Sequence, residues 1–220
     1  MVLRGRDNSQ LSTGTLPHFG VACSGYGRAP ALQEWLMDLT YPDPEPSSGI
    51  VRIRKWTYDD LRCIEAASTD PEIPQGTTIP ADYTEAKGRA FVERQWSRND
   101  DGQALALAIA RTDSNEAVGH IYLGLTKVKR QCRLGYWLIP GARRRGYGSN
   151  AVDLISRWLL TETDVYRVVA EVHPDNVASA RLLESCGYTL EGTLRSWLWI
   201  QDEVYDALQY SLVRSDLSSA

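Results

Sequence analysis

The stretch Gly135-Tyr-Trp-Leu-Ile-Pro-Gly-Ala-Arg-Arg-Arg-Gly-Tyr-Gly-Ser149 decides the fold of this chain. It starts as an apolar strand, breaks at a Pro/Gly pair, and then places three arginines and two spaced glycines before an amphipathic segment. Glycines let the backbone approach an anion closely, and the free N–H groups of a helix N-terminus point at it. Arginine adds donors that suit phosphate oxygens. The order of parts therefore predicts a strand, a phosphate-binding loop and a helix.

The pattern outside this stretch predicts a mixed α/β domain. Apolar alternation and short apolar runs predict strands at residues 50–56, 104–110, 117–126, 132–138, 167–172, 190–200 and 204–212. Helical spacing and capping residues predict helices at 57–68, 84–97, 149–160 and 176–185. Residues 69–83 hold three prolines and are typical of a loop. The strand–loop–helix–strand unit predicts a right-handed crossover between two parallel strands.

Composition limits the class of protein. The chain has 220 residues, of which 43% are hydrophobic, and this length suits one domain with an appendage. Residues 1–49 are predicted to form a Pro/Gly/Ser-rich extension, 50–214 the folded domain and 215–220 a tail. A formal charge of −4 disfavours nucleic acid as a partner. The proline-rich arm and the closing hairpin leave room for a homodimer.

The chain shows no signal for a membrane or a metal. No apolar run approaches the ~20 residues of a membrane span, and the first residues lack the apolar core of a signal peptide, so a cytoplasmic protein is expected. Three histidines and four scattered cysteines show no metal-ligand spacing, and we expect no metal.

Several motifs together resemble the GNAT superfamily of acyl-CoA-dependent N-acyltransferases, and its RimJ/RimL branch most closely. The superfamily motif Gln/Arg-x-x-Gly-x-Gly/Ala stands here as Arg143-Arg-Arg-Gly146-Tyr-Gly148. A second motif runs from Asn176 through Ser179 to Gly187-Tyr188, and the segment Ile53-Arg-Lys-Trp-Thr-Tyr-Asp-Asp60 is similar to the opening of that branch. The resemblance covers about residues 50–213. It implies a central, mostly antiparallel twisted sheet with a splayed parallel pair at its middle, flanked by helices.

The resemblance also implies acetyl-CoA as co-substrate. Backbone amides of residues 144–149 would reach its pyrophosphate, Arg143 and Arg145 would neutralise charge, and Arg144 would face solvent. The pantetheine arm would pair with the strand edge. The implied cofactor-binding residues are Trp137, Leu138, Ile139, Arg143, Arg144, Arg145, Gly146, Tyr147, Gly148, Ser149, Asn176 and Ser179. The competing interpretation is a surface arginine cluster beside an ordinary glycine turn, with the strand side chains packed in the core.

Catalysis needs a proton donor for the leaving thiolate and a base for the amine. The resemblance assigns the donor role to Ser179, which could instead bond only the backbone of its helix. Many superfamily members place a tyrosine acid seven residues after the asparagine, where this chain has Leu183. Glu171 is the predicted base. The other options are Glu203, Asp206, His120 and His173.

The acceptor is expected to bind between residues 70–83 and the closing hairpin, near Trp197 and Trp199, which themselves are expected to pack rather than recognise substrate. RimL-like enzymes carry a Glu where this chain has Leu198, which favours a small molecule over a ribosomal protein. The predicted reaction is acetyl transfer to a primary amine of an amino sugar antibiotic or amino metabolite. Alternatives are a protein N-terminal α-amine acetyltransferase and a non-catalytic acyl-CoA-binding module. A dinucleotide enzyme fits poorly, since Ala151 stands at the place of the third glycine.

Overall fold

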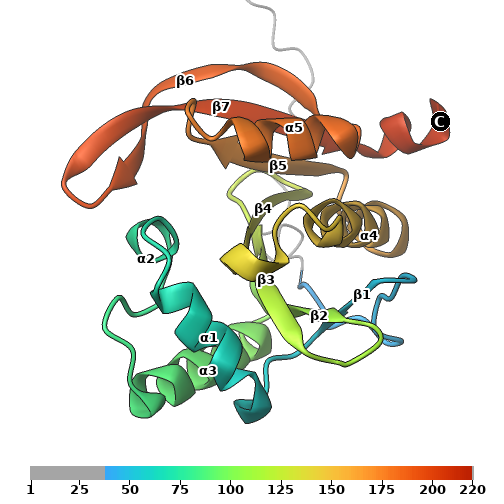
Figure 1. Cartoon of the computed structure of the whole chain (residues 1–220). Helices are drawn as coiled ribbons and strands as arrows, with labels where there is room; N and C mark the ends of the chain where they lie inside the picture. The colour runs from blue at the N-terminus through green and yellow to red at the C-terminus, as the bar shows by residue number, and fades with distance from the viewer. Residues whose placement is uncertain (1–37, 220) are drawn as a thin grey trace, which may run out of the picture.

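The computed structural model describes residues 38–219, so most of the predicted extension, residues 1–37, lies outside the described residues, as does residue 220 of the tail. The described part folds around one seven-stranded sheet with the order β1-β2-β3-β4-β5-β7-β6 (Figure 1). The strands are β1 Val51–Arg54, β2 Ala104–Arg111, β3 Ala117–Leu125, β4 Gln131–Leu138, β5 Arg167–Val172, β6 Thr189–Ile200 and β7 Glu203–Val213. All neighbouring pairs are antiparallel except β4 and β5. This confirms the predicted mostly antiparallel mixed sheet.

The parallel pair at the middle of the sheet separates soon after it forms. β4 and β5 are in register at only three positions, from Gln131 opposite Arg167 to Arg133 opposite Val169. Beyond them, the ends of both strands continue without pairing to each other. β4 stays bonded to β3 along its whole length, and β5 stays bonded to β7. The result is the predicted splay.

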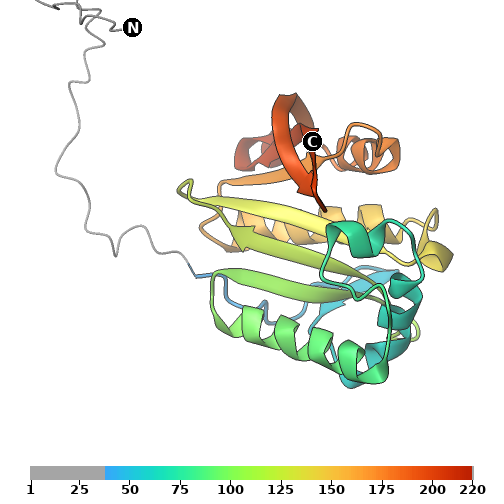
Figure 2. The ribbon, with the colours of Figure 1, turned by 90° about the vertical axis from the view of Figure 1, so that its left-hand side faces the viewer.

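Helices cover both faces of the sheet (Figure 1, Figure 2). Their bounds are α1 Leu61–Ser68, α2 Ile73–Gly76, α3 Glu85–Asp100, α4 Tyr147–Glu162 and α5 Val177–Ser185. Trp56, Ile64 and Phe91 form one buried cluster between α1, α3 and the sheet. Leu107 and Ile155 belong to the larger cluster on the opposite face, where α4 packs. The splay thus lies between two filled cores.

Local signals explain where the helices start. Thr57 and Asp60 form a capping box, Thr84 accepts the N–H of Lys87, and Asn176 accepts the N–H of Ser179. Several boundaries differ from prediction, and two of these differences lie near the site. α4 begins at Tyr147, two residues early, and the predicted loop 69–83 contains the short helix α2. Asp70 caps that helix by accepting the N–H groups of Glu72 and Ile73, and a proline is tolerated in its first turn.

Within residues 38–219, no helix has both the length and the apolar character needed to cross a bilayer. In the same part of the chain, no three His, Cys, Asp or Glu side chains are grouped so that they could hold a metal ion.

Candidate active site

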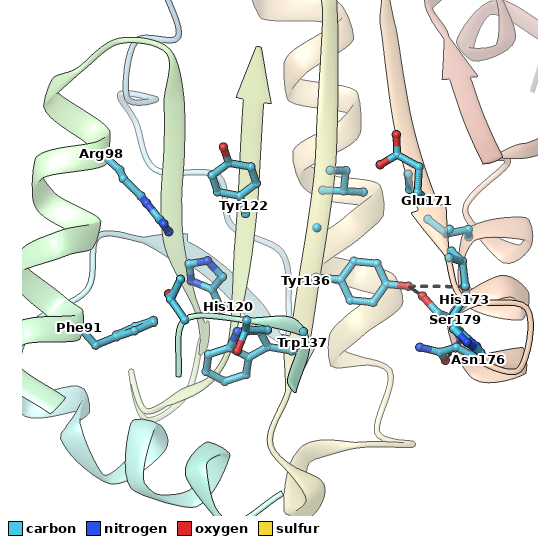
Figure 3. Close-up of a pocket in the computed structure, with 18 residues that line it drawn as sticks. Phe91, Arg98, His120, Tyr122, Tyr136, Trp137, Glu171, His173, Asn176 and Ser179 are labelled. Atoms are coloured by element: carbon cyan, nitrogen blue, oxygen red, sulfur yellow. Dashed lines mark hydrogen bonds between the residues drawn. The ribbon is translucent and has the colours of Figure 1, made fainter. Parts of the chain in front are cut away.

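A cavity of about 430 Å³ opens where β4 and β5 separate (Figure 3). Tyr136 reaches into it from β4, Glu171 from β5 and Ser179 from α5. The other side of the cavity lies against the face of the sheet that α3 covers, and here Arg98 and Phe91 of α3 approach the strands. The further lining on this side is Gly76, Thr77, Thr78, His120, Tyr122 and Trp137. One cavity therefore joins the splay to a pocket on the α3 face.

The loop before α4 has the geometry of an anion cradle. Gly146 is the N-cap of α4 and has a φ of 80°, a conformation that favours glycine. The first helical bond of this turn is donated by Asn150 N–H to Gly146 O, and among residues 38–219 the amides of residues 144–149 have no hydrogen-bond partner. Unpaired amides at a helix N-terminus attract anions. The predicted pyrophosphate loop is thus available to a ligand.

Gly148 has a different role from Gly146. A Cβ on Gly148 would lie 2.8 Å from Leu182 Cδ1 and 3.2 Å from Leu138 Cδ1, whereas one on Gly146 would meet nothing closer than 3.7 Å. Gly148 therefore allows close packing of α4 against β4 and α5, and Gly146 allows the turn. Tyr147 and Ser149, also predicted ligands, lie in the first turn of α4, and Ser149 Oγ donates to Gly146 O.

Arg143 is committed to the protein itself. Its Nη2 lies 2.7 Å from Asp70 Oδ2, and its Nε donates to Leu138 O. Burial alone would raise the pKa of Asp70, but the N–H groups of Ile73 and Glu72 together with Arg143 lower it below its ordinary value. Arg143 thus links the α2 loop to the cradle, and its predicted contact with phosphate stays a prediction.

The other two arginines of the motif do not make contacts of this kind in the described part of the chain. Arg144 and Arg145 are exposed, and neither makes an ion pair within the described residues. Arg144 has a φ of 61°, which places this non-glycine residue in the left-handed region at the start of the cradle. These two side chains therefore leave exposed positive charge beside the cradle.

The hydrogen bonds of β4 decide which backbone groups face the splay. Ile139 N–H donates to Val118 O, and Leu138 lies opposite Gly119. Because bonding alternates along an antiparallel pair, Trp137 and Ile139 direct their N–H groups to β3, and Leu138 turns its N–H towards the splay. Tyr136 has the same orientation as Leu138. The strand edge predicted at 137–139 is therefore corrected to Tyr136 and Leu138, with the side chain of Trp137 in the core beside Trp56.

Ser179 has a partner that the sequence did not indicate. The hydroxyl oxygens of Ser179 and Tyr136 are 2.7 Å apart, and either can donate (Figure 3). Burial raises the pKa of Tyr136 to about 12, so its hydroxyl is protonated at neutral pH. A tyrosine hydroxyl is thus supplied from β4, although Leu183 occupies the usual tyrosine position on α5.

Asn176 fulfils the capping role and keeps donors for a ligand. Its Oδ1 accepts the N–H of Ser179 at 3.0 Å. Its Nδ2 makes no hydrogen bond to any residue in the range 38–219, and the residue lines the cavity. Capping of α5 and binding of a ligand by Asn176 are therefore physically compatible.

Glu171 lies in the cavity at the point where the strands diverge. Its side chain is 9% exposed, and Oε2 pairs with Arg133 Nε at 2.8 Å. The second oxygen, Oε1, has no hydrogen-bond partner among residues 38–219. This carboxylate can accept a proton from a group bound in the cavity.

The other base candidates fit less well. His120 Nδ1 accepts the N–H of Trp56, so the lone pair that a base would need is already used, and burial lowers the pKa of His120 to about 3. His173 Nδ1 accepts the N–H of Asp175. Glu203 bonds Tyr205 and Asp206 accepts the N–H of Ser196 on the hairpin, and neither lines the cavity.

The acceptor side differs from the prediction in one respect. Residues 76–78 of the predicted loop line the cavity, but no residue of β6 or β7 does. Trp197 is 50% exposed and Trp199 72% exposed, so the expected packing of these two rings is not found in the described chain. The lining of the cavity on this side comes instead from α3, β3 and β4.

Comparison with known proteins agrees with this geometry. Residues 51–189 match the sequence model of the acetyltransferase (GNAT) domain family. The uncharacterized N-acetyltransferase YoaA of Bacillus subtilis is 25% identical over 163 residues, which cover 74% of this chain and 92% of YoaA.

Two solved structures illustrate the range of similar folds. RimL, a ribosomal L7/L12 α-N-protein acetyltransferase in complex with coenzyme A, superposes with a TM-score of 0.66 at 18% identity, over 76% of this chain and 96% of RimL. A chimera of the spermidine N-acetyltransferase SpeG from Vibrio cholerae and hSSAT gives a TM-score of 0.64 at 16% identity, over 79% of this chain and 100% of the chimera.

Proposed function

Because this chain belongs to the GNAT acetyltransferase family, we propose that it transfers the acetyl group of acetyl-CoA to a primary amine of a small molecule. The observation that carries the proposal is the single cavity that connects the splay with the pocket on the α3 face. The donor enters along the splay and the acceptor from the α3 face, so the thioester and the amine meet between Tyr136 and Glu171.

Donor binding rests on backbone groups. The unpaired amides of residues 144–149 hold the pyrophosphate, with Arg144 and Arg145 adding charge. The pantetheine arm pairs with the N–H groups of Tyr136 and Leu138, as an added strand would. Asn176 Nδ2 is within the same lining and adds a donor. An N–H of β4 that points at the thioester oxygen stabilises the negative charge that develops there.

The reaction needs a base for the ammonium group and a proton donor for the leaving thiolate. Glu171 accepts a proton from the ammonium group, directly or through one water, and the neutral amine nitrogen attacks the thioester carbon. The C–N bond forms, the C–S bond breaks, and the electron pair leaves on the sulfur. The nitrogen loses its second proton to water as the C–S bond breaks. Ser179 donates its proton to the thiolate, and Tyr136 replaces that proton through their shared hydrogen bond and is itself reprotonated from solvent.

A panel of amines incubated with acetyl-CoA and a thiol-detecting reagent tests this function. We expect release of free CoA with at least one small amine, and loss of most of the turnover in Glu171→Gln and Ser179→Ala. Matched controls are Glu65→Gln on α1 and Ser185→Ala on α5, because neither residue lines the cavity. Peptides with free N-termini belong in the same panel. Turnover of peptides alone would favour the protein N-terminal alternative, and tight acetyl-CoA binding without any turnover would favour a binding module.

A further inference from the structure

The acceptor side of the cavity contains a guanidinium group without an acidic partner. Arg98, in the last turn of α3, points towards the cavity and lines it (Figure 3). Its Nη1 donates to Gln95 Oε1 at 3.1 Å, and its guanidinium carbon lies 5.9 Å from the centre of the Tyr122 ring. Within residues 38–219 it makes no ion pair. Most of its five N–H donors are therefore available to a ligand.

The orientation of Arg98 is fixed by a buried amide. Gln95 is fully buried, and its Nε2 donates to Phe91 O at 2.7 Å, which leaves its Oε1 directed at Arg98. A buried side-chain amide with both ends bonded holds its partner in one position. Arg98 is thus a positioned donor and not a freely moving surface charge.

Nothing else in the cavity lining balances this charge. Glu171 is the one carboxylate among the described lining residues, and it is paired with Arg133. His120, next to Arg98, is neutral because its Nδ1 accepts the N–H of Trp56. Its remaining ring N–H, on Nε2, has no partner in the described chain and adds a second donor. The α3 side of the cavity therefore offers donors and a net positive charge.

We infer that the acceptor carries a carboxylate or phosphate group, which Arg98 binds while the amine lies at Glu171. This inference rests on the proposed function and names the class of its substrate. An amine with a second positive charge in place of the oxyanion would be repelled by Arg98, so polyamines are poor acceptors. A guanidinium group matches the paired oxygens of either oxyanion.

The sheet gives an approximate distance between the two groups. Tyr122, over which Arg98 lies, is on β3, and Glu171 is on β5, with β4 between them. Two strand spacings of about 4.8 Å, widened by the splay, separate the groups by on the order of 10 Å. The amine and the oxyanion are therefore separated by several bonds, as in an ω-amino acid. An α-amino acid would be too short.

Three amines of equal length test the charge requirement: 6-aminohexanoate, 1,6-diaminohexane and hexylamine, with 6-aminohexyl phosphate as the second oxyanion. In the wild-type protein we expect kcat/KM for the better of the two oxyanion substrates to exceed that for the diamine by roughly 10- to 100-fold, the usual value of one charge-assisted contact. Glycine, with the same end groups at short spacing, is expected to react poorly.

Variants of Arg98 separate this inference from the proposed function. Arg98→Gln should abolish the preference for the oxyanion, Arg98→Lys should retain part of it, and Arg98→Glu should reverse it in favour of the diamine. Arg89→Gln is the control, because Arg89 lies on the same helix, pairs with Glu85 and does not line the cavity. Thermal melting verifies that each variant folds.

Each failure has its own signature. Turnover of hexylamine or the diamine at least as fast as that of the oxyanion substrates would overturn the inference and leave the acetyltransferase function intact. An unchanged preference in Arg98→Gln would also overturn it. Absence of turnover with every amine, despite acetyl-CoA binding, would instead contradict the proposed function.

Discussion

Breaking the contact between Asp70 and Arg143 tests whether this motif arginine serves the fold or the ligand. We expect Asp70→Asn and Arg143→Gln each to lower the unfolding free energy, and the double variant to lower it hardly further. The reason is that both single changes remove the same 2.7 Å ion pair, while Asn keeps the oxygen that caps α2.

The size of the effect follows from burial. Asp70 is 2% exposed and Arg143 is 42% exposed. A hydrogen bond to a charged group contributes about 1.5–3 kcal/mol, and solvent around the half-exposed arginine screens this to about 1–2 kcal/mol. For a chain of this size, that is a fall in Tm of about 2–8 °C. The pKa of Asp70 is lowered in the folded state, so the contribution is complete above its unfolded pKa and is lost as the pH falls through the lower folded value.

Urea unfolding of the four proteins at neutral pH gives the coupling energy, and titration with CoA gives the affinity. We expect a coupling of about 1–2 kcal/mol and nearly unchanged CoA binding in both single variants. The double replacement of Arg144 and Arg145 by Gln should weaken CoA binding by about 10-fold, since exposed charge contacts contribute little each. Two additive losses would refute the pairing. Weak CoA binding in Arg143→Gln with normal binding in Asp70→Asn would restore Arg143 to the phosphate site.

Two further predictions concern single residues. Burial holds the pKa of His120 near 3, so the contribution of the neutral ring to stability is complete above its unfolded pKa of about 6.5. On acidification this contribution declines by up to about 1.4 kcal/mol per pH unit. Urea unfolding between pH 7 and pH 4 should therefore show a shallower decline in the unfolding free energy of His120→Asn than of the wild type, and equal slopes would contradict this. Gly148→Leu should lower the unfolding free energy by about 1–3 kcal/mol, because the new side chain meets Leu182. Gly146→Ala should lower it by about 1–2 kcal/mol and chiefly weaken CoA binding. Thermal melting and CoA titration measure the two effects, and the larger loss of CoA binding in Gly148→Leu would contradict this assignment.

Local sequence patterns predicted the helices, the strands and the cradle. They could not predict contacts between residues that lie far apart in the sequence. The φ of Gly146 and the cap at Asn176 depend on neighbouring residues, so the motif was sufficient to place them. The pair Tyr136–Ser179 joins positions 43 residues apart, and Arg143–Asp70 joins positions 73 apart. Such partners follow from the order of the strands. An apolar run in the sequence does not show which of its tyrosines will face the splay between two strands.

The register of β4 explains another difference. The resemblance indicated a segment of this strand, but which of its residues turn their N–H groups to the splay depends on where the first hydrogen bond to β3 falls. One residue of shift exchanges every N–H between the neighbouring strand and the splay. The Ile139–Val118 bond fixes that choice, and no local pattern in residues 135–139 contains it.

The splay between β4 and β5 also divides the sheet mechanically. Within the sheet, strands β1 to β4 are paired with strands β5 to β7 at only three positions. Beyond these positions, the sheet becomes continuous only when a bound molecule fills the gap between β4 and β5. Under the proposed function, the acyl donor fills this place as a removable strand. Its binding then adds to the cohesion of the whole domain, by about 2.7 kcal/mol at a free concentration 100 times its Kd. The resistance of this protein to unfolding would therefore follow the supply of its own co-substrate.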